Sequence, residues 1–294
     1  SFEVKKMRAY DEAVKLLPSK TAAQLGKNTE TAEEFRLRIG FEPTALIDGV
    51  QVPLAGGVIT ENDIAAVLEK ATRASVHAFS QDIAKGFIGC RCGIRLGLCG
   101  TGVCSGGAVT ALREISSVCI RIPHELHCAL SEDILMLLHN KGANILILSP
   151  PGGGKTTLLR EFVRALSTGG VRVSVADERG EIAAVYAGRA QFDLGESCDV
   201  MTDVPKAQAV MMLLRSMSPQ VIAMDEISSP DDINAALSAA GCGVRLIATI
   251  HAASVRDLSK RPVYRELIKS GIFTDAVTIH NKNGRRSYSC EVLS

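Results

Sequence analysis

The first part of the chain alternates between helical and strand-like patterns. Over residues 3–17 the apolar positions recur at helical spacing, which predicts an amphipathic helix. Residues 35–39 alternate between apolar and charged side chains, which predicts a strand with one buried face. Thr60 and Asp63 form a variant capping box ahead of apolar positions within 64–71, and we expect a second helix to begin there.

Glycine-rich segments follow that helix. Residues 86–110 contain eight glycines between short apolar runs, which we interpret as short strands that form a hairpin. Residues 117–122 predict another short strand. Helices mixed with short strands in this way indicate an α+β domain, which we assign to residues 1–128.

The pattern changes in the second domain, residues 129–294. Apolar runs occur at 144–149, 171–176, 221–224 and 244–250, as expected of buried strands. Helical patterns separate most of these runs, and this alternation predicts a parallel sheet covered by helices.

Two local signals add detail to the second domain. Residues 229–232 combine a serine cap, a proline and two acids, which predicts a helix N-terminus. Residues 272–293 predict a hairpin that turns at Asn283 and Gly284.

A glycine-rich loop joins the run at 144–149 to a helix predicted for residues 155–167. Lys155 and Thr156 follow three glycines, which is the order of a phosphate-binding P-loop in its strand-to-helix context. The glycines let backbone N–H groups face an anion, the helix presents its positive end, and Lys155 adds a charge. The common pattern starts with glycine, whereas this loop starts with Ser149 at the strand end. The predicted nucleotide-binding residues are Ser149, Pro150, Pro151, Gly152, Gly153, Gly154, Lys155, Thr156 and Thr157.

Another apolar strand ends in two acids, Asp225 and Glu226. Asp225 would hold Mg²⁺ together with the Thr156 hydroxyl, and Glu226 would polarise a water for attack on a γ-phosphate. Two acids at a strand end are a weak signal alone, but these come 70 positions after Lys155 with a strand between. Together the two motifs predict an NTPase of the P-loop class.

Polar residues follow two further strands. Parallel strands bring their carboxyl ends to one edge of a sheet, so the acidic segment 177–181, Thr249 and His251 would approach the nucleotide. Thr249 would contact the γ-phosphate, and His251 would donate to phosphate or to the acids. The alternatives are a solvated surface loop for 177–181 and a structural role for the histidine.

Composition excludes several classes of protein. The length of 294 residues fits two domains, and the hydrophobic fraction of 46% allows a sizeable core. The longest uncharged run, 96–112, has 17 residues and is rich in glycine, so we expect no membrane-spanning helix. Residues 1–6 lack the apolar stretch of a signal peptide, and we expect a cytoplasmic protein. A net charge of +1 and 4% aromatic residues do not indicate nucleic-acid binding.

Four of the nine cysteines lie close together, at positions 90, 92, 99 and 104. Their spacing does not match the paired knuckles of structural zinc sites. We interpret them as small buried residues between strands, with zinc binding as the alternative.

These motifs resemble the stage III sporulation protein AA family, P-loop ATPases of endospore-forming bacteria. The resemblance covers approximately residues 30–290 and is most specific at 149–160, 177–182, 211–219 and 225–226, with serine at 149 as the family's usual form. That family is similar to the type II and type IV secretion ATPases, which are hexamers. The resemblance therefore implies an α/β fold: a RecA-like P-loop NTPase motor domain with a parallel sheet, preceded by a smaller α+β N-terminal domain.

The resemblance also implies roles for individual residues. Lys155 and Thr156 would belong to the Walker A motif, and Asp225 and Glu226 to Walker B, with ATP and Mg²⁺ as ligands. Asp177 would join an acidic box. The catalytic candidates are Glu226, the acidic-box residues Glu178 and Glu181, and His251 in a histidine box.

An arginine from another subunit or domain usually completes such sites. The candidates are Arg95, Arg113 and Arg121, each of which has a structural role as its simpler interpretation.

The family works in the mother cell beneath a channel complex in the membranes around the forespore. The implied function is ATP hydrolysis that energises or assembles this secretion-like channel. The implied partners are further copies of the chain, in a hexamer, and channel subunits that alone bring it to the outer forespore membrane. One alternative is a nucleic-acid translocase or helicase with the same core. Another is a scaffold that binds nucleotide to lock an oligomer but hydrolyses it very little.

Overall fold

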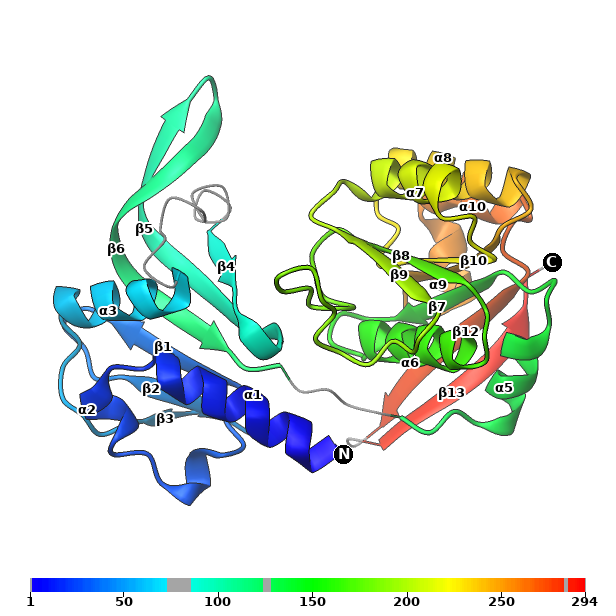
Figure 1. The fold of residues 1–294 in the computed structure, drawn as a ribbon. Coiled ribbons are helices and arrows are strands. Elements are labelled where there is room, and N and C mark those ends of the chain that lie inside the picture. The colour runs from blue at the N-terminus through cyan, green and yellow to red at the C-terminus, as the bar shows by residue number, and fades with distance from the viewer. Residues whose placement is uncertain (1, 73–85, 124–127, 283–284, 294) are drawn as a thin grey trace. The chain divides into compact units, whose positions relative to one another are not determined.

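The computed structural model describes residues 2–72, 86–123, 128–282 and 285–293 (Figure 1). The chain divides into two compact units. The N-terminal unit comprises residues 1–125 with 186–191, and the C-terminal unit comprises residues 126–185 with 192–294. Across the ranges that the structure describes, no helix combines the length and apolar character that crossing a membrane requires.

The N-terminal unit is built on a six-stranded sheet in the order β3-β2-β1-β6-β5-β4, in which every neighbouring pair is antiparallel. Its strands are β1 (Glu34–Arg38), β2 (Thr44–Ile47), β3 (Val50–Pro53), β4 (Phe87–Gly89), β5 (Arg95–Ser105) and β6 (Ala108–Arg121). Its helices are α1 (Phe2–Leu16), α2 (Ser19–Ala22), α3 (Glu61–Thr72) and the short 3₁₀ helices η1 (Lys27–Thr29) and η3 (Arg91–Gly93). Strand residues such as Phe35 and Ile120 share one buried core with Val67 of α3.

The helices and the first strand predicted for this unit are confirmed. Helix α3 begins with the expected capping box, since the Asp63 N–H donates to Thr60 Oγ1 at 3.3 Å and the Thr60 N–H donates to Asp63 Oδ2 at 2.8 Å. The hairpin predicted within 86–110 also forms, but it is longer than expected. Residues 117–122 are not a separate strand, because all but the last of them belong to the 14-residue strand β6.

The C-terminal unit contains a seven-stranded sheet in the order β13-β12-β7-β11-β10-β8-β9. Its strands are β7 (Ile145–Ser149), β8 (Val173–Asp177), β9 (Cys198–Thr202), β10 (Val221–Met224), β11 (Arg245–His251), β12 (Asp275–Lys282) and β13 (Arg285–Val292). All neighbouring strands are parallel except β12 and β13, which form the predicted terminal hairpin. The four predicted buried strands are confirmed as β7, β8, β10 and β11, whereas β9 is an edge strand that the apolar pattern missed.

Helices cover both faces of this sheet (Figure 1). They are α5 (Glu132–His139), α6 (Lys155–Thr168), α7 (Lys206–Ser216), α8 (Pro230–Gly241), α9 (Val255–Lys260) and α10 (Pro262–Lys269). Alternate residues of β7 enter opposite cores: Ile147 packs with Phe162 of α6, whereas Leu148 packs in the core that contains Val210 of α7. The serine N-cap predicted at Ser229 is present at the start of α8, where it forms a capping box with Asp232.

Candidate nucleotide-binding site

The predicted P-loop lies between β7 and α6. Gly154 is the N-cap of α6 and has a left-handed backbone with φ of 98°. A Cβ at Gly153 would lie 1.6 Å from Ser149 Oγ, so only glycine fits there. The Ser149 hydroxyl is buried and donates to the Pro150 carbonyl at 3.1 Å. Ser149 therefore packs under the loop, while the glycines give the loop its path into the helix.

Lys155 is buried at the mouth of this loop. Its Nζ donates to the carbonyls of Ser149 at 3.1 Å and Pro150 at 3.3 Å, and lies 2.6 Å from Nδ1 of His251. Burial lowers the pKa of Lys155, and the carboxylates of Glu226 and Asp225 act in the opposite direction. An ammonium group only donates, so His251 Nδ1 accepts and its hydrogen belongs on Nε2.

That assignment directs His251 Nε2–H at a carboxylate. Glu226 Oε1 lies 3.2 Å from His251 Nε2. His251 thus bridges Lys155 of the P-loop to Glu226 at the end of β10, and it stands 32% exposed at the strand end. The expectation that the carboxyl ends of these strands bring the predicted residues together is met by this chain of contacts.

Asp225 holds two hydroxyl groups. Thr156 Oγ1 donates to Asp225 Oδ2 at 3.3 Å, and Thr249 Oγ1 donates to Asp225 Oδ1 at 2.8 Å. Within the described residues no three metal-binding His, Cys, Asp or Glu side chains gather. Mg²⁺, however, is usually held by one or two protein oxygens together with substrate phosphates and waters. Thr156 and Asp225 fit that requirement.

Glu226 has a strained backbone, with φ of 45°. Its N–H donates to Thr249 Oγ1 at 2.7 Å, and its carbonyl accepts from Lys206 Nζ at 2.6 Å. The same Thr249 hydroxyl therefore accepts from Glu226 and donates to Asp225, and the residue is fully buried. Thr249 thus holds the two acids in place, and its contact with a γ-phosphate stays a prediction.

The acidic segment 177–181 divides into parts with different tasks. The Asp177 carboxylate is buried and accepts the backbone N–H groups of Glu181, Ile182 and Ala183 at 2.9–3.1 Å. Burial raises the pKa of Asp177, and these backbone hydrogen bonds oppose that rise. Its carboxylate thus shapes its own loop.

Glu178 lines a cavity together with Asp225 and Glu226, and Glu181 does not line it. Glu178 Oε2 accepts the backbone N–H of Lys206 at 3.2 Å. A small cavity brings the acids of the two segments together, and its lining is Asp177, Glu178, Arg179, Lys206, Asp225 and Glu226. Glu181 is exposed and lies outside this lining. The sequence-based grouping of Glu178 with Glu181 is therefore not reproduced around this cavity.

Two buried cations support the site and were not predicted. Lys206 Nζ lies 3.8 Å from Asp232 Oδ2 and 4.0 Å from Glu178 Oε2, and it donates to the Glu226 carbonyl. Arg160 of α6 donates to the carbonyls of Ile182 at 2.8 Å and Glu181 at 2.9 Å. Lys206 lies outside the motifs quoted above, and Arg160 is the last residue of the stretch 149–160. Neither supporting role is visible in the sequence, because each depends on which helix end packs against which loop.

The three candidate arginines lie in the N-terminal unit. Arg95 stacks over the Phe87 ring at 4.3 Å, and Arg121 Nε lies 3.9 Å from Glu34 Oε2. Arg113 is on an exposed part of β6. For Arg95 and Arg121 the structure supplies the structural role that was the simpler interpretation.

The cysteine cluster also differs from expectation. Cys90 is buried, as predicted, but Cys99 and Cys104 are exposed on β5. The interpretation as small buried residues is therefore wrong for Cys99 and Cys104, because the hairpin extends beyond the core. In the part of the chain that the structure describes, no cluster suited to zinc forms.

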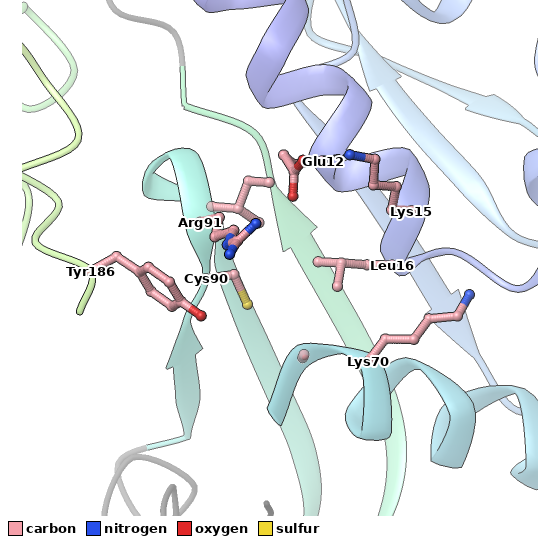
Figure 2. A pocket seen from close by; sticks show the side chains of 9 residues that line it. Glu12, Lys15, Leu16, Lys70, Cys90, Arg91 and Tyr186 are labelled. Atoms are coloured by element: carbon pink, nitrogen blue, oxygen red, sulfur yellow. Dashed lines mark hydrogen bonds and ion pairs between the residues drawn. The ribbon is translucent and has the colours of Figure 1, made fainter. Parts of the chain in front are cut away.

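A separate cavity of about 360 Å³ lies in the N-terminal unit (Figure 2). Lys15 from α1 pairs with Glu12 at 2.5 Å, and Lys70 from α3 donates to the Leu17 carbonyl at 2.6 Å. The cavity contains none of the residues predicted to bind nucleotide. The predicted chemistry is therefore concentrated in the C-terminal unit.

Solved ATPase structures share the arrangement of this chain. The ATPase DotB of Legionella pneumophila matches with a TM-score of 0.61 at 15% identity, over 96% of this chain and 78% of that one. The pilus retraction motor PilT with bound ADP matches with a TM-score of 0.61 at 18% identity, over 91% of this chain and 80% of that one. These matches confirm the predicted RecA-like P-loop fold.

Sequence comparison identifies the family. The family described as Sporulation stage III, protein AA matches residues 10–288. Stage III sporulation protein AA of Bacillus subtilis (strain 168) is 36% identical over 258 residues, which are 86% of this chain and 83% of that protein. Protein SEEDLING PLASTID DEVELOPMENT 1 of Arabidopsis thaliana is 31% identical over 163 residues, 53% of this chain and 23% of that protein. The chain belongs to the stage III sporulation protein AA family.

Proposed function

We propose that this protein is an ATP hydrolase whose active site is the P-loop edge of the C-terminal sheet. The observation that carries the proposal is the continuous contact from Lys155 through His251 to Glu226, with Thr156 and Asp225 alongside. Phosphate binding, metal binding and base catalysis need these residue types within a few ångströms of one another.

The reaction follows from these positions. The loop N–H groups and Lys155 bind the phosphates, Lys155 exchanging loop carbonyls for phosphate oxygens. Thr156 and Asp225 would hold Mg²⁺, which would supply neutralising charge to the phosphates when bound. Glu226 accepts a proton from the attacking water while the water oxygen bonds to the γ-phosphorus. The bond from that phosphorus to the bridging oxygen breaks, and ADP leaves with the electron pair.

The surrounding residues keep Glu226 ready for this step. Thr249 and Lys206 fix its backbone, and His251 Nε2–H orients its carboxylate. We propose that Glu178 contributes through Lys206, and that Glu181 acts outside the immediate site.

We propose further that the protein works as a homo-hexamer with membrane channel subunits during sporulation. Family membership and the shared fold of the secretion-type ATPases support this role. Hydrolysis would energise or assemble the channel from the mother-cell cytoplasm, with membrane contact made through partners. The low aromatic content and near-zero net charge favour this over nucleic-acid translocation.

The test is ATP turnover by the purified chain with Mg²⁺. Lys155→Ala should lose both ADP binding and hydrolysis. Glu226→Gln should keep ADP binding and lose about 10²–10⁴-fold in turnover, the usual contribution of a positioned base. Exposed residues of α10 offer matched controls, Lys269→Ala and Glu266→Gln, which should behave as the wild type.

Normal turnover in Glu226→Gln would refute its catalytic assignment. Nucleotide binding without turnover in either wild type or Glu226→Gln would favour the locked scaffold. Stimulation by single-stranded DNA would favour the translocase.

A further inference from the structure

The C-terminal hairpin extends past the carboxyl end of β7, the strand that leads into the P-loop (Figure 1). Strand β12 pairs in parallel with β7 from Asp275 opposite Ile145 to Thr278 opposite Leu148. Strand β7 ends one residue later, at Ser149, whereas β12 continues to Lys282. At a rise of about 3.3 Å per residue, the hairpin therefore projects about 10 Å past the strand end. Residues near its tip stand beside the P-loop.

Arg286 is the residue that makes use of this position. It pairs with Asn281 in the hairpin register. A Cβ built on Gly154 would lie 2.9 Å from Arg286 Cζ and 3.1–3.2 Å from its two terminal nitrogens. The guanidinium thus lies against Gly154, the last glycine of the P-loop. It occupies space that a side chain at position 154 would fill.

Arg286 carries a charge that the described part of the chain does not compensate. Its side chain is exposed, and among the described residues no acceptor hydrogen-bonds or ion-pairs with it. Glu161, which like Arg286 acts electrostatically on Tyr288, pairs with Arg164 at 2.6 Å. Gly154 caps α6, whose N-terminus carries partial positive charge. A guanidinium at this positive helix end, against the glycine that precedes Lys155, is placed to bind an anion that approaches the loop.

We propose that Arg286 is a phosphate-binding residue of the nucleotide site, contributed in cis by the C-terminal hairpin. The proposal rests on the nucleotide binding proposed above and identifies one more residue of that site. The guanidinium fork matches phosphate oxygens in geometry as well as in charge.

Sheet order indicates which phosphates Arg286 contacts. Asp225 and Glu226 follow β10 and His251 ends β11, and both strands lie on one side of β7. Arg286 is on β13, on the other side of β7. A polyphosphate whose γ end faces Glu226 directs its α- and β-phosphates towards Arg286. Arg286 therefore binds ADP and ATP alike and takes no part in attack on the γ-phosphate.

The experiment is calorimetric titration of the whole 294-residue chain with Mg²⁺ and either ADP or the β,γ-imido analogue of ATP. Arg286→Ala should weaken both ligands equally, by about tenfold, which corresponds to about 1.4 kcal/mol. Arg286→Lys should fall between, because it keeps the charge and loses the fork. Arg265→Ala, an exposed arginine of α10, is the matched control and should bind as the wild type does.

The outcomes separate the two proposals. Wild-type protein that binds neither ligand would overturn nucleotide binding itself, and with it the role of Arg286. Wild-type binding with unchanged ADP affinity in Arg286→Ala would overturn only the role of Arg286. A loss confined to the ATP analogue would also overturn it, because it would place Arg286 at the γ-phosphate.

Discussion

Lys206 connects the residues around Glu226. Its buried Nζ donates to the Glu226 carbonyl and lies within 4.0 Å of carboxylate oxygens of Glu178 and Asp232. Because Glu226 has a left-handed backbone, removal of this donor should let it relax and move its carboxylate. Misplacement of a catalytic group by about 1 Å costs about 10²-fold in rate.

We therefore expect Lys206→Met to lower kcat by about 10²-fold while ADP affinity changes little. Steady-state kinetics beside ADP titration separate these quantities, and Lys260→Met on α9 is an exposed control. A variant that keeps its kcat would show that Lys206 only stabilises the fold.

At this scale the sequence identifies residue types better than their tasks. The order of Lys155 and Thr156 after three glycines is strong enough to place the P-loop. The acids at 177–181 are different, since strand alternation does not reveal that Asp177 binds its own loop while Glu178 reaches Lys206. Lys206 and Arg286 depend on tertiary register and leave no motif.

At the scale of elements, long apolar runs were predictable and short polar elements were not. Strands β7, β10 and β11 are buried throughout or nearly so, and their runs predicted them. Strand β9 lies at a sheet edge with partly exposed residues, so its sequence carries little apolar signal. Glycines made the long ribbon of β5 and β6 look like short strands, although its pairing continues through two register shifts.

Gly100 explains why that ribbon needs glycine. It lies at the first register shift, and a Cβ there would be 2.5 Å from the Arg113 carbonyl oxygen and 2.9 Å from that of Glu114. Gly100→Ala should push the strands apart and destabilise the ribbon by about 1–3 kcal/mol, the usual cost of overpacking.

Hydrogen exchange of peptides within 95–121 measures this opening directly. Gly102→Ala is the matched control, since a Cβ at Gly102 meets nothing within 4 Å. Equal exchange in the two variants would mean that the ribbon adjusts to the methyl group at no cost.

At the scale of the whole molecule, the candidate functional residues are divided unequally between the two units. Phosphate, metal and base candidates all belong to the C-terminal unit, so nucleotide should stabilise that unit directly. A ligand that binds only the folded state raises the free energy of unfolding by about 2.7 kcal/mol when its free concentration is 100 times its Kd. One thiol in each unit, buried at Cys90 and half-buried at Cys198, can report where this stabilisation acts.

Cys90 and Cys198 provide those reporters. Burial raises the pKa of each thiol to about 12, with Asp199 adding to the effect at Cys198. Near pH 8 both thiols stay protonated and shielded, so iodoacetamide should label the exposed Cys99, Cys104 and Cys242 first. Because the thiolate is the reactive form, labelling of Cys90 and Cys198 should increase with pH or when their units open.

Mass spectrometry after iodoacetamide pulses in increasing urea tests the ligand effect. With Mg²⁺ and ADP, labelling of Cys198 should shift to higher urea, because its unit holds the nucleotide, while labelling of Cys90 should not shift. Lys155→Ala is the control, and in this variant ADP should not change the urea dependence of Cys198 labelling. An equal shift at both cysteines would contradict separate stabilities and show that the two units open in one cooperative step.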